Sequence, residues 1–123
     1  MRRIRSNNTS PELIVRRMVH GMGYRYRLHV AALPGKPDLV FPRLRKIVEV
    51  RGCFWHQHKS CADSHIPKSR IEYWRPKLNG NKRRDKQNEK KLLALGWALC
   101  IVWECELKNL DEVNRRLARF LST

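Results

Sequence analysis

Residues 37–56 read PDLVFPRLRKIVEVRGCFWH, in which two short apolar runs flank a basic turn. The runs, at 38–41 and 46–50, are rich in the β-branched and aromatic residues that favour strands. Pro42 to Arg45 has the length and composition of a hairpin turn, so the pattern predicts two antiparallel strands. Because Asp38 opens the first run and Glu49 lies near the end of the second, this hairpin would bring the two carboxylates to facing ends.

The stretch before the hairpin predicts a helix and a further strand. Thr9 and Glu12 fit a capping box, and Pro11 suits the first helical position after Ser10. Apolar residues then recur at helical spacing up to the glycines at 21 and 23, which should end the helix. Residues 24–30 alternate apolar with polar side chains, as a half-buried strand does. Residues 1–8 are expected to form a mobile basic arm.

The stretch after the hairpin completes an α/β pattern. Residues 51–69 have no clear period, which indicates an irregular loop. Three of the four candidate metal ligands lie in this loop, so we expect a metal to brace it. The polar stretch 70–95 is expected to end in a helix, and the almost wholly apolar run 97–103 predicts a central strand buried on both faces. Residues 111–121 form an amphipathic helical pattern. The predicted order, α-β-β-β-loop-α-β-α, indicates one mixed α/β domain covering 1–123.

Composition limits the class of function. The 123 residues include 27 Lys and Arg against 11 Asp and Glu, a net charge of +16, which favours a polyanionic partner such as nucleic acid. No apolar run approaches the ~20 residues of a membrane span, and no signal-peptide core follows the basic start. The four cysteines favour a metal site over disulfides. We therefore expect a cytoplasmic, DNA-associated protein that does not enter membranes.

Two carboxylates and one histidine are candidates for hydrolytic chemistry. Asp38 and Glu49 could hold a hard divalent cation through oxygen ligands, and such a cation would polarise a phosphodiester. His56 is the natural general base near neutral pH. The alternative is that Asp38 caps a turn while Glu49 pairs with a basic side chain. The remaining histidines are expected to be ordinary surface residues: His20, His29 and His65.

Three ligand-type side chains within nine residues indicate a second metal site. Cys53, His58 and Cys61, joined by the distant Cys105, could form a closed tetrahedral zinc site. The spacing is not that of a standard zinc finger. The alternative is that the cysteines are small buried apolar residues and His58 lies on the surface. Cys100, in the middle of a predicted strand, is expected to be a core residue.

Aromatic residues surround this cysteine-rich segment. Phe54 and Trp55 follow Cys53 directly, and Trp74 lies beyond the loop. Exposed aromatic side chains in a basic, irregular segment suit stacking between unpaired or mismatched bases. Ordinary core packing is the alternative, and it is the interpretation we favour for Trp97 and Trp103.

Several motifs together resemble the very-short-patch repair DNA mismatch endonucleases. The resemblance runs from about residue 4 to residue 105 and is in register apart from one extra residue between His58 and Cys61. Its most specific string is the Gly-Cys-Phe-Trp-His of residues 52–56. The motifs are Thr9-x-Pro11-Glu12, Leu33-Pro34-Gly35-x-Pro37-Asp38, Gly52-Cys53-Phe54-Trp55-His56-x-His58, Pro67-Lys68, Tyr73-Trp74, Arg84-Asp85 and Gly96-Trp97-x5-Trp103-Glu104-Cys105.

The resemblance implies a restriction-endonuclease-like core, with a mixed central sheet flanked by helices and a zinc-braced loop. It further implies an Mg²⁺-dependent enzyme that nicks one strand of double-stranded DNA beside a T:G mismatch. The product ends would be a 5′-phosphate and a 3′-hydroxyl. The implied partners are mismatch-containing DNA and other mismatch-repair proteins, and we expect the chain to act as a monomer.

The resemblance also implies roles for individual residues. Asp38 and the backbone carbonyl of Val50 would bind Mg²⁺, His56 would be the general base, and Glu12 would assist at the active site. The structural Zn²⁺ would be held by Cys53, His58, Cys61 and Cys105. The DNA-contacting set would be Phe54, Trp55 and Trp74 as an aromatic wedge, together with Arg51.

This sequence departs from the family pattern at the end of the hairpin. The family carries no acid at the position of Glu49 and a histidine at that of Arg51, whereas Glu49-Val50-Arg51 is closer to the acidic-x-Lys triplet of restriction nucleases. Glu49 is therefore a further candidate ligand for Mg²⁺. The amino-terminal arm is also short. Two alternatives stay open, a non-catalytic zinc-stabilised DNA-binding module and a dimeric restriction-type nuclease.

Overall fold

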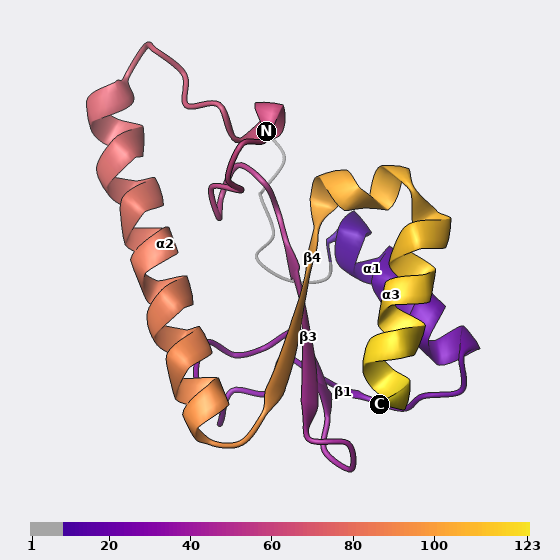
Figure 1. Cartoon of the computed structure of the whole chain (residues 1–123). Coiled ribbons are helices and arrows are strands. Elements are labelled where there is room, and N and C mark those ends of the chain that lie inside the picture. Colours follow the sequence, from indigo (N-terminus) through magenta and orange to yellow (C-terminus); the bar gives the residue numbers. More distant parts are fainter. Residues whose placement is uncertain (1–8) are drawn as a thin grey trace.

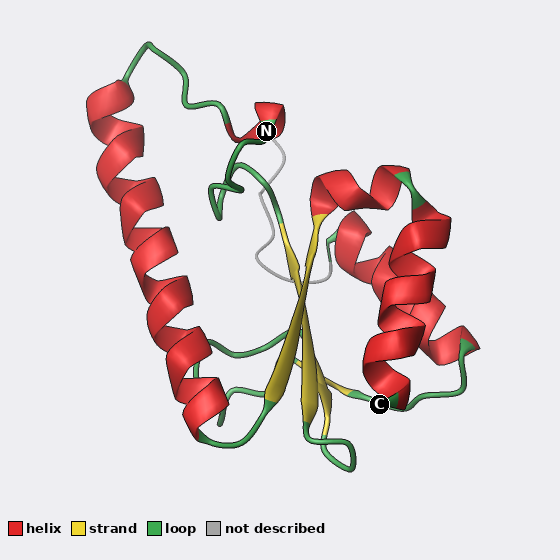
Figure 2. Ribbon diagram, viewed as in Figure 1, coloured by secondary structure: helices red, strands yellow, loops and turns green. Residues whose placement is uncertain are grey.

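Helices cover both faces of a small sheet in the computed structural model, which describes residues 9–123 (Figures 1 and 2). The predicted order of elements is confirmed, while the arm predicted for residues 1–8 lies outside the described residues. The elements are α1 (Ser10–Gly21), β1 (Arg27–Leu28), β2 (Leu39–Phe41), β3 (Lys46–Arg51), the 3-10 turn η1 (Ala62–Ser64), α2 (Ile71–Ala94), β4 (Ala98–Trp103), the 3-10 turn η2 (Glu104–Lys108) and α3 (Leu110–Ser122).

The sheet is mixed, with strand order β1-β2-β3-β4. β1, β2 and β3 are successively antiparallel, which confirms the predicted hairpin. β4 runs parallel to β3, and the long helix α2 makes the crossover that a parallel pair requires. In the hairpin Leu39 pairs with Val48, so the next position in that register brings Asp38 opposite Glu49.

Each face of the sheet has its own apolar core. On the face covered by α1 and α3, the buried core includes Leu39, Phe41 and Val48. On the face covered by α2, it includes Val40 and Ile47. Because side chains alternate along a strand, positions 38, 49 and 51 belong to the α2 face. The sheet therefore ends, beneath α2, in charged residues rather than in apolar ones.

Two strand predictions need correction. The run 97–103 was expected to be a central strand, but β4 lies at the end of the described strand order and pairs with β3 alone. Its apolar character comes from the helices on either side, α2 and α3, and not from strands at both edges. The strand predicted over 24–30 shrinks to Arg27–Leu28, because His29 takes a left-handed backbone (φ 47°) that ends the ladder.

The helix predicted toward the end of the polar stretch is longer than expected. α2 spans 24 residues from Ile71 to Ala94, and its buried residues are Leu78 and Leu92 alone. Most of this helix is polar and faces solvent, which is why its first half carries little apolar periodicity. Among the described residues, no helix combines the length and the apolar character that crossing a membrane requires.

Gly35 generates a stability prediction because it combines a left-handed backbone (φ 78°) with close contact to α2. A Cβ at this position would lie 2.9 Å from Asn88 Nδ2 and 3.1 Å from Asn88 Cβ. Gly35→Ala should therefore lower the free energy of unfolding by at least about 1–2 kcal/mol. Gly21→Ala is the matched control, because nothing lies within 4 Å of its added Cβ. This control should raise stability by about 0.4–1 kcal/mol in urea unfolding. Equal effects of the two substitutions would contradict this packing.

Candidate active site and cysteine-histidine centre

Asp38 is fixed at the mouth of a pocket by the backbone of the neighbouring strand. It directly precedes β2, and its Oδ2 accepts a hydrogen bond from the Val50 N–H at 2.8 Å. The pocket encloses about 240 Å³ between the ends of β2 and β3 and helix α2. Its lining includes His29, Asp38, Glu49, Val50, Arg51, His56 and Asp85. The predicted meeting of Asp38, Glu49 and His56 is thus present in the structure.

Burial disfavours the charged form of two carboxylates in the pocket, Asp38 and Glu49. Burial raises the pKa of Asp38 to about 6, against the opposing hydrogen bond from Val50 and with a further increase from the charge of Glu12. Burial likewise raises the pKa of Glu49 to about 6, while Arg51 lowers it and Asp38 raises it. Two facing carboxylates with raised pKa values form a site that a divalent cation would stabilise.

Arg51 is buried between the sheet and α2. It is 5% exposed, and its guanidinium lies 3.6 Å from Glu49 and 3.0 Å from Glu89. Glu49 therefore has the basic partner that one interpretation expected, while it also lines the pocket. Arg51 Nε is buried with no hydrogen-bond partner among the described residues. The role of Arg51 in DNA contact stays a prediction.

His56 is oriented by a carboxylate from α2. Its Nδ1 lies 2.7 Å from Asp85 Oδ2, so the Nδ1–H donates to the carboxylate. This arrangement leaves Nε2 as the ring nitrogen that can accept a proton. Asp85 was quoted only as part of a motif, and its contact with His56 spans 29 residues. A helix pattern alone does not reveal such a partner.

Glu12 and His29 form a second carboxylate-histidine pair next to Asp38. The side chain of Thr9 accepts a hydrogen bond from the Glu12 N–H at 3.4 Å, which confirms the predicted helix start. Glu12 is 2% exposed, and both of its carboxylate oxygens lie near His29 Nε2, at 3.0 and 2.9 Å. The expectation that His29 is an ordinary surface residue was wrong. Its left-handed backbone and its partner 17 residues away leave no local sequence signal.

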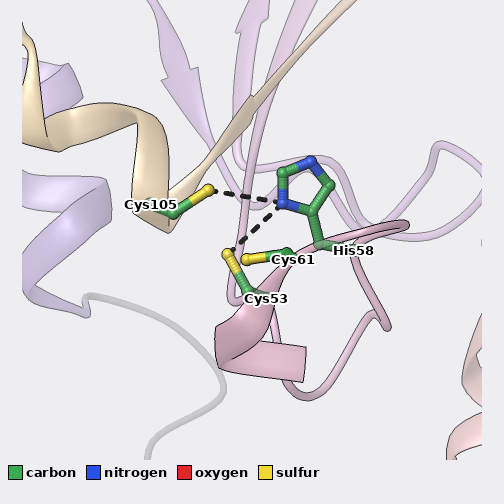
Figure 3. A group of neighbouring side chains, drawn as sticks. All are labelled: Cys53, His58, Cys61 and Cys105. Atoms are coloured by element: carbon green, nitrogen blue, oxygen red, sulfur yellow. Dashed lines mark hydrogen bonds between the residues drawn. The ribbon is translucent and has the colours of Figure 1, made fainter. Parts of the chain in front are cut away.

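The four predicted zinc-ligand side chains converge (Figure 3). The ligand atoms of Cys53, His58, Cys61 and Cys105 all lie within 4.8 Å of one another. His58 Nδ1 is 3.6 Å from Cys53 Sγ and 3.3 Å from Cys105 Sγ. The His58 ring also stacks on Trp103, with centroids 4.2 Å apart. This grouping, which joins the irregular loop to the end of β4, could hold a metal ion.

The cysteine outside this group behaves as predicted. Cys100 packs against the core beneath α1 and α3. Burial raises the pKa of its thiol. Within the metal-type group, burial raises the pKa of Cys53 to about 12.

The three predicted wedge residues contact one another. The ring centroid of Phe54 lies 5.2 Å from that of Trp55 and 5.2 Å from that of Trp74. The ring centroids of the two tryptophans are 5.7 Å apart. All three are half-buried. Asn81 of α2 donates a hydrogen bond to the Trp55 carbonyl at 3.0 Å. The aromatic cluster therefore connects the loop after β3, which also carries His56, to the start of α2.

Comparison with known proteins assigns the chain to a family. The family described as DNA mismatch endonuclease Vsr matches residues 1–63. The Type II nicking enzyme V.XorIIP of Xanthomonas oryzae pv. oryzae is 48% identical over 121 residues, covering 98% of this chain and 88% of that protein. The DNA mismatch endonuclease Vsr of Escherichia coli is 36% identical over 114 residues, covering 93% and 72%. The chain belongs to the Vsr family.

This Vsr-family chain is a DNA endonuclease, and its fold has a solved counterpart. The catalytic domain of the homing endonuclease I-Bth0305I aligns with a TM-score of 0.60 over 92% of this chain and 94% of that one. At 17% identity the likeness concerns the fold alone. It confirms the predicted endonuclease-type α/β core with a mixed sheet between helices.

The raised pKa of Asp38 predicts a pH-dependent cost in stability for the Vsr-family fold. The folded protein holds the Asp38 proton up to about pH 6, whereas the ordinary value is 3.8. Stability should therefore fall as pH rises between these values and stay reduced above them. Without added divalent cations, Asp38→Asn should melt at a higher temperature than the wild type at pH 7.5. Its free energy of unfolding should be higher by up to about 3 kcal/mol.

The gain from Asp38→Asn should vanish below about pH 3, where both the folded and the unfolded wild type hold the Asp38 proton. The asparagine oxygen can still accept the Val50 N–H, which isolates the effect of charge. Melting curves at the two pH values provide the measurement. The same difference at both would show that burial of the charge is not its cause.

Proposed function

We propose that this Vsr-family enzyme nicks one strand of double-stranded DNA beside a T:G mismatch, with Mg²⁺ as the catalytic cation. The product ends are a 5′-phosphate and a 3′-hydroxyl. The observation that carries this proposal is the pocket in which the half-buried Asp38 lies beside the Asp85-oriented His56. The naming of similar proteins as nicking enzymes supports single-strand cleavage.

The residues of the pocket fit a hard cation. Asp38 would bind Mg²⁺ together with the carbonyl of Val50, and Glu49 would supply a second carboxylate. Burial removes water that would otherwise stabilise the two carboxylate charges. A bound cation would stabilise these charges in its place. When bound, Mg²⁺ polarises the phosphodiester and lowers the pKa of a coordinated water.

The protein's own residues move the proton. His56 Nε2 takes a proton from the attacking water while Asp85 holds the ring through Nδ1. The water oxygen bonds to phosphorus, the bond from phosphorus to the 3′-oxygen breaks, and the leaving 3′-oxygen takes a proton from solvent to become the 3′-hydroxyl. Glu12 assists from the opposite side of Asp38 by fixing His29 and adding negative charge near the cation.

DNA binding uses the basic exterior and the aromatic cluster. Exposed basic side chains lie along α2, namely Arg75, Lys77, Lys82, Arg83, Arg84, Lys86, Lys90 and Lys91. Phosphates attract these side chains, while Phe54, Trp55 and Trp74 would insert beside the mismatch. We propose that the single domain of 1–123 acts as a cytoplasmic monomer, followed by mismatch-repair proteins that process the nick.

Cleavage of duplexes labelled separately on each strand tests this function. With Mg²⁺, the wild type should cut one strand of a T:G duplex and leave the matched duplex intact. Asp38→Ala should abolish cutting, and His56→Ala should slow it by about 10²–10⁴-fold at saturating Mg²⁺. Glu49→Gln should raise the Mg²⁺ concentration for half-maximal rate.

The same assay separates the alternatives. Binding without cleavage at any Mg²⁺ concentration would indicate a DNA-binding module. Cutting of both strands would indicate a restriction-type nuclease. Equal rates on matched and mismatched duplexes would refute mismatch specificity. Unaltered Mg²⁺ dependence in Glu49→Gln would leave Glu49 as the ion-pair partner of Arg51 alone.

Structural zinc is the second part of the proposal. Zn²⁺ held by Cys53, His58, Cys61 and Cys105 would anchor the loop that carries Trp55 and His56. Cys105→Ser should reduce the zinc content, which we expect to be one ion per chain in the wild type, and lower the melting temperature. Cys100→Ser is the matched control and should keep the zinc. Full zinc content in Cys105→Ser, measured by elemental analysis, would refute this ligand set.

A further inference from the structure

Asp38 belongs to two groups of potential metal ligands. The first, with Glu49 and the Val50 carbonyl, offers oxygen alone. The second consists of Glu12, His29 and Asp38, whose ligand atoms all lie within 4.8 Å of one another. These three come from α1, from the residue after β1 and from the residue before β2. The second group includes a nitrogen donor, and neither the family nor the resemblance assigns His29 a role.

The three side chains are held in place by different parts of the fold. Glu12 lies in the first turn of α1 and is 2% exposed, with Arg16 3.4 Å from its carboxylate. The His29 N–H donates to the Asp38 carbonyl at 3.0 Å, which sets the histidine beside Asp38. The Asp38 side chain is fixed in turn by Val50. The donors therefore converge without the long, free side chains that an accidental surface group has.

We propose that Glu12, His29 and Asp38 form a second divalent-cation site, which takes a transition-metal ion in preference to Mg²⁺. Two carboxylates and one neutral imidazole balance the charge of a divalent ion. Imidazole suits iron, nickel and zinc, whereas Mg²⁺ favours oxygen ligands and retains its water. Mn²⁺ serves as the paramagnetic probe of this site. Since Asp38 is shared, a cation here would lie next to the one in the proposed catalytic position, as in two-metal nuclease sites.

The simpler interpretation is that Glu12 and His29 form only an ion pair, in which His29 Nε2 lies 2.9 Å from Glu12 Oε2. The two interpretations differ in one respect that can be measured. An ion pair places no imidazole nitrogen on a bound cation, whereas the proposed site does. The inference uses the proposed function only for the neighbouring Mg²⁺ position, and its test needs neither DNA nor cleavage.

Electron spin echo spectroscopy of Mn²⁺ bound to the zinc-loaded full chain, without DNA, tests the site. The wild type should show the ¹⁴N modulation of a coordinated imidazole. His29→Asn should lose it and should bind Mn²⁺ at least about tenfold more weakly, as loss of a ligand costs no less than loss of a ligand's partner. Asparagine suits this position because it tolerates the left-handed backbone of residue 29 (φ 47°).

Two further variants complete the experiment. His56→Ala removes the other histidine of the pocket and should keep the ¹⁴N modulation. Glu12→Gln retains the imidazole and should weaken Mn²⁺ binding, and unchanged melting temperatures would show that each variant is folded. An absence of imidazole modulation in the wild type would overturn the proposal, as would modulation that survives in His29→Asn or disappears in His56→Ala. Failure to nick DNA with the Mn²⁺ signal intact would count against the proposed function alone.

Discussion

The hydrogen bond from the Val50 N–H to Asp38 Oδ2 is the constraint on which the site depends. It uses a backbone donor at the end of β3 to fix a side chain at the start of β2. The bond stabilises the charged carboxylate in a half-buried position, where removal from water disfavours the charge. Burial still raises the pKa of Asp38 to about 6. The strand register then places Glu49 opposite, so the hairpin builds an anionic pair from two positions eleven residues apart. A pocket with two facing carboxylates arises from ordinary strand pairing.

The chain combines a basic exterior with an acidic pocket. Its net charge is +16, yet the pocket and its surroundings concentrate carboxylates, namely Glu12, Asp38, Glu49, Asp85 and Glu89. A uniformly basic protein would repel the cations that phosphodiester hydrolysis needs, and a uniformly acidic one would repel DNA. Gathering carboxylates around one pocket allows a small basic domain to attract both. Arg51, buried between Glu49 and Glu89, limits the repulsion inside the pocket.

The loop after β3 has little regular structure, and side-chain clusters hold it instead. The cysteine-histidine group attaches it to η2 beyond β4, and the aromatic cluster attaches it to α2. His56 lies between these two anchors in the sequence. Its position therefore depends on both clusters as well as on Asp85, which makes the loop a part of the candidate active site.

The sequence by itself determined the local features of this protein. The capped helix start at Thr9, the hairpin of 38–50 and the buried stripe of α3 were all predicted, because each rests on the spacing of nearby residues. The resemblance carried by Gly52 to His56 identified the family. The four cysteine and histidine side chains were also correctly grouped, and three of them lie within nine residues.

Only the tertiary structure decided which distant residues meet. Asp85 reaches His56 across 29 residues, and Glu89 reaches Arg51 across the space between α2 and the sheet. His29 lies against Glu12 because its left-handed backbone turns the chain there, and β4 lies at the end of the strand order although its sequence resembles that of a central strand. Periodicity reports which side of an element is buried. The partner on that side depends on how the elements pack, because contacts between distant residues leave no spacing in the chain.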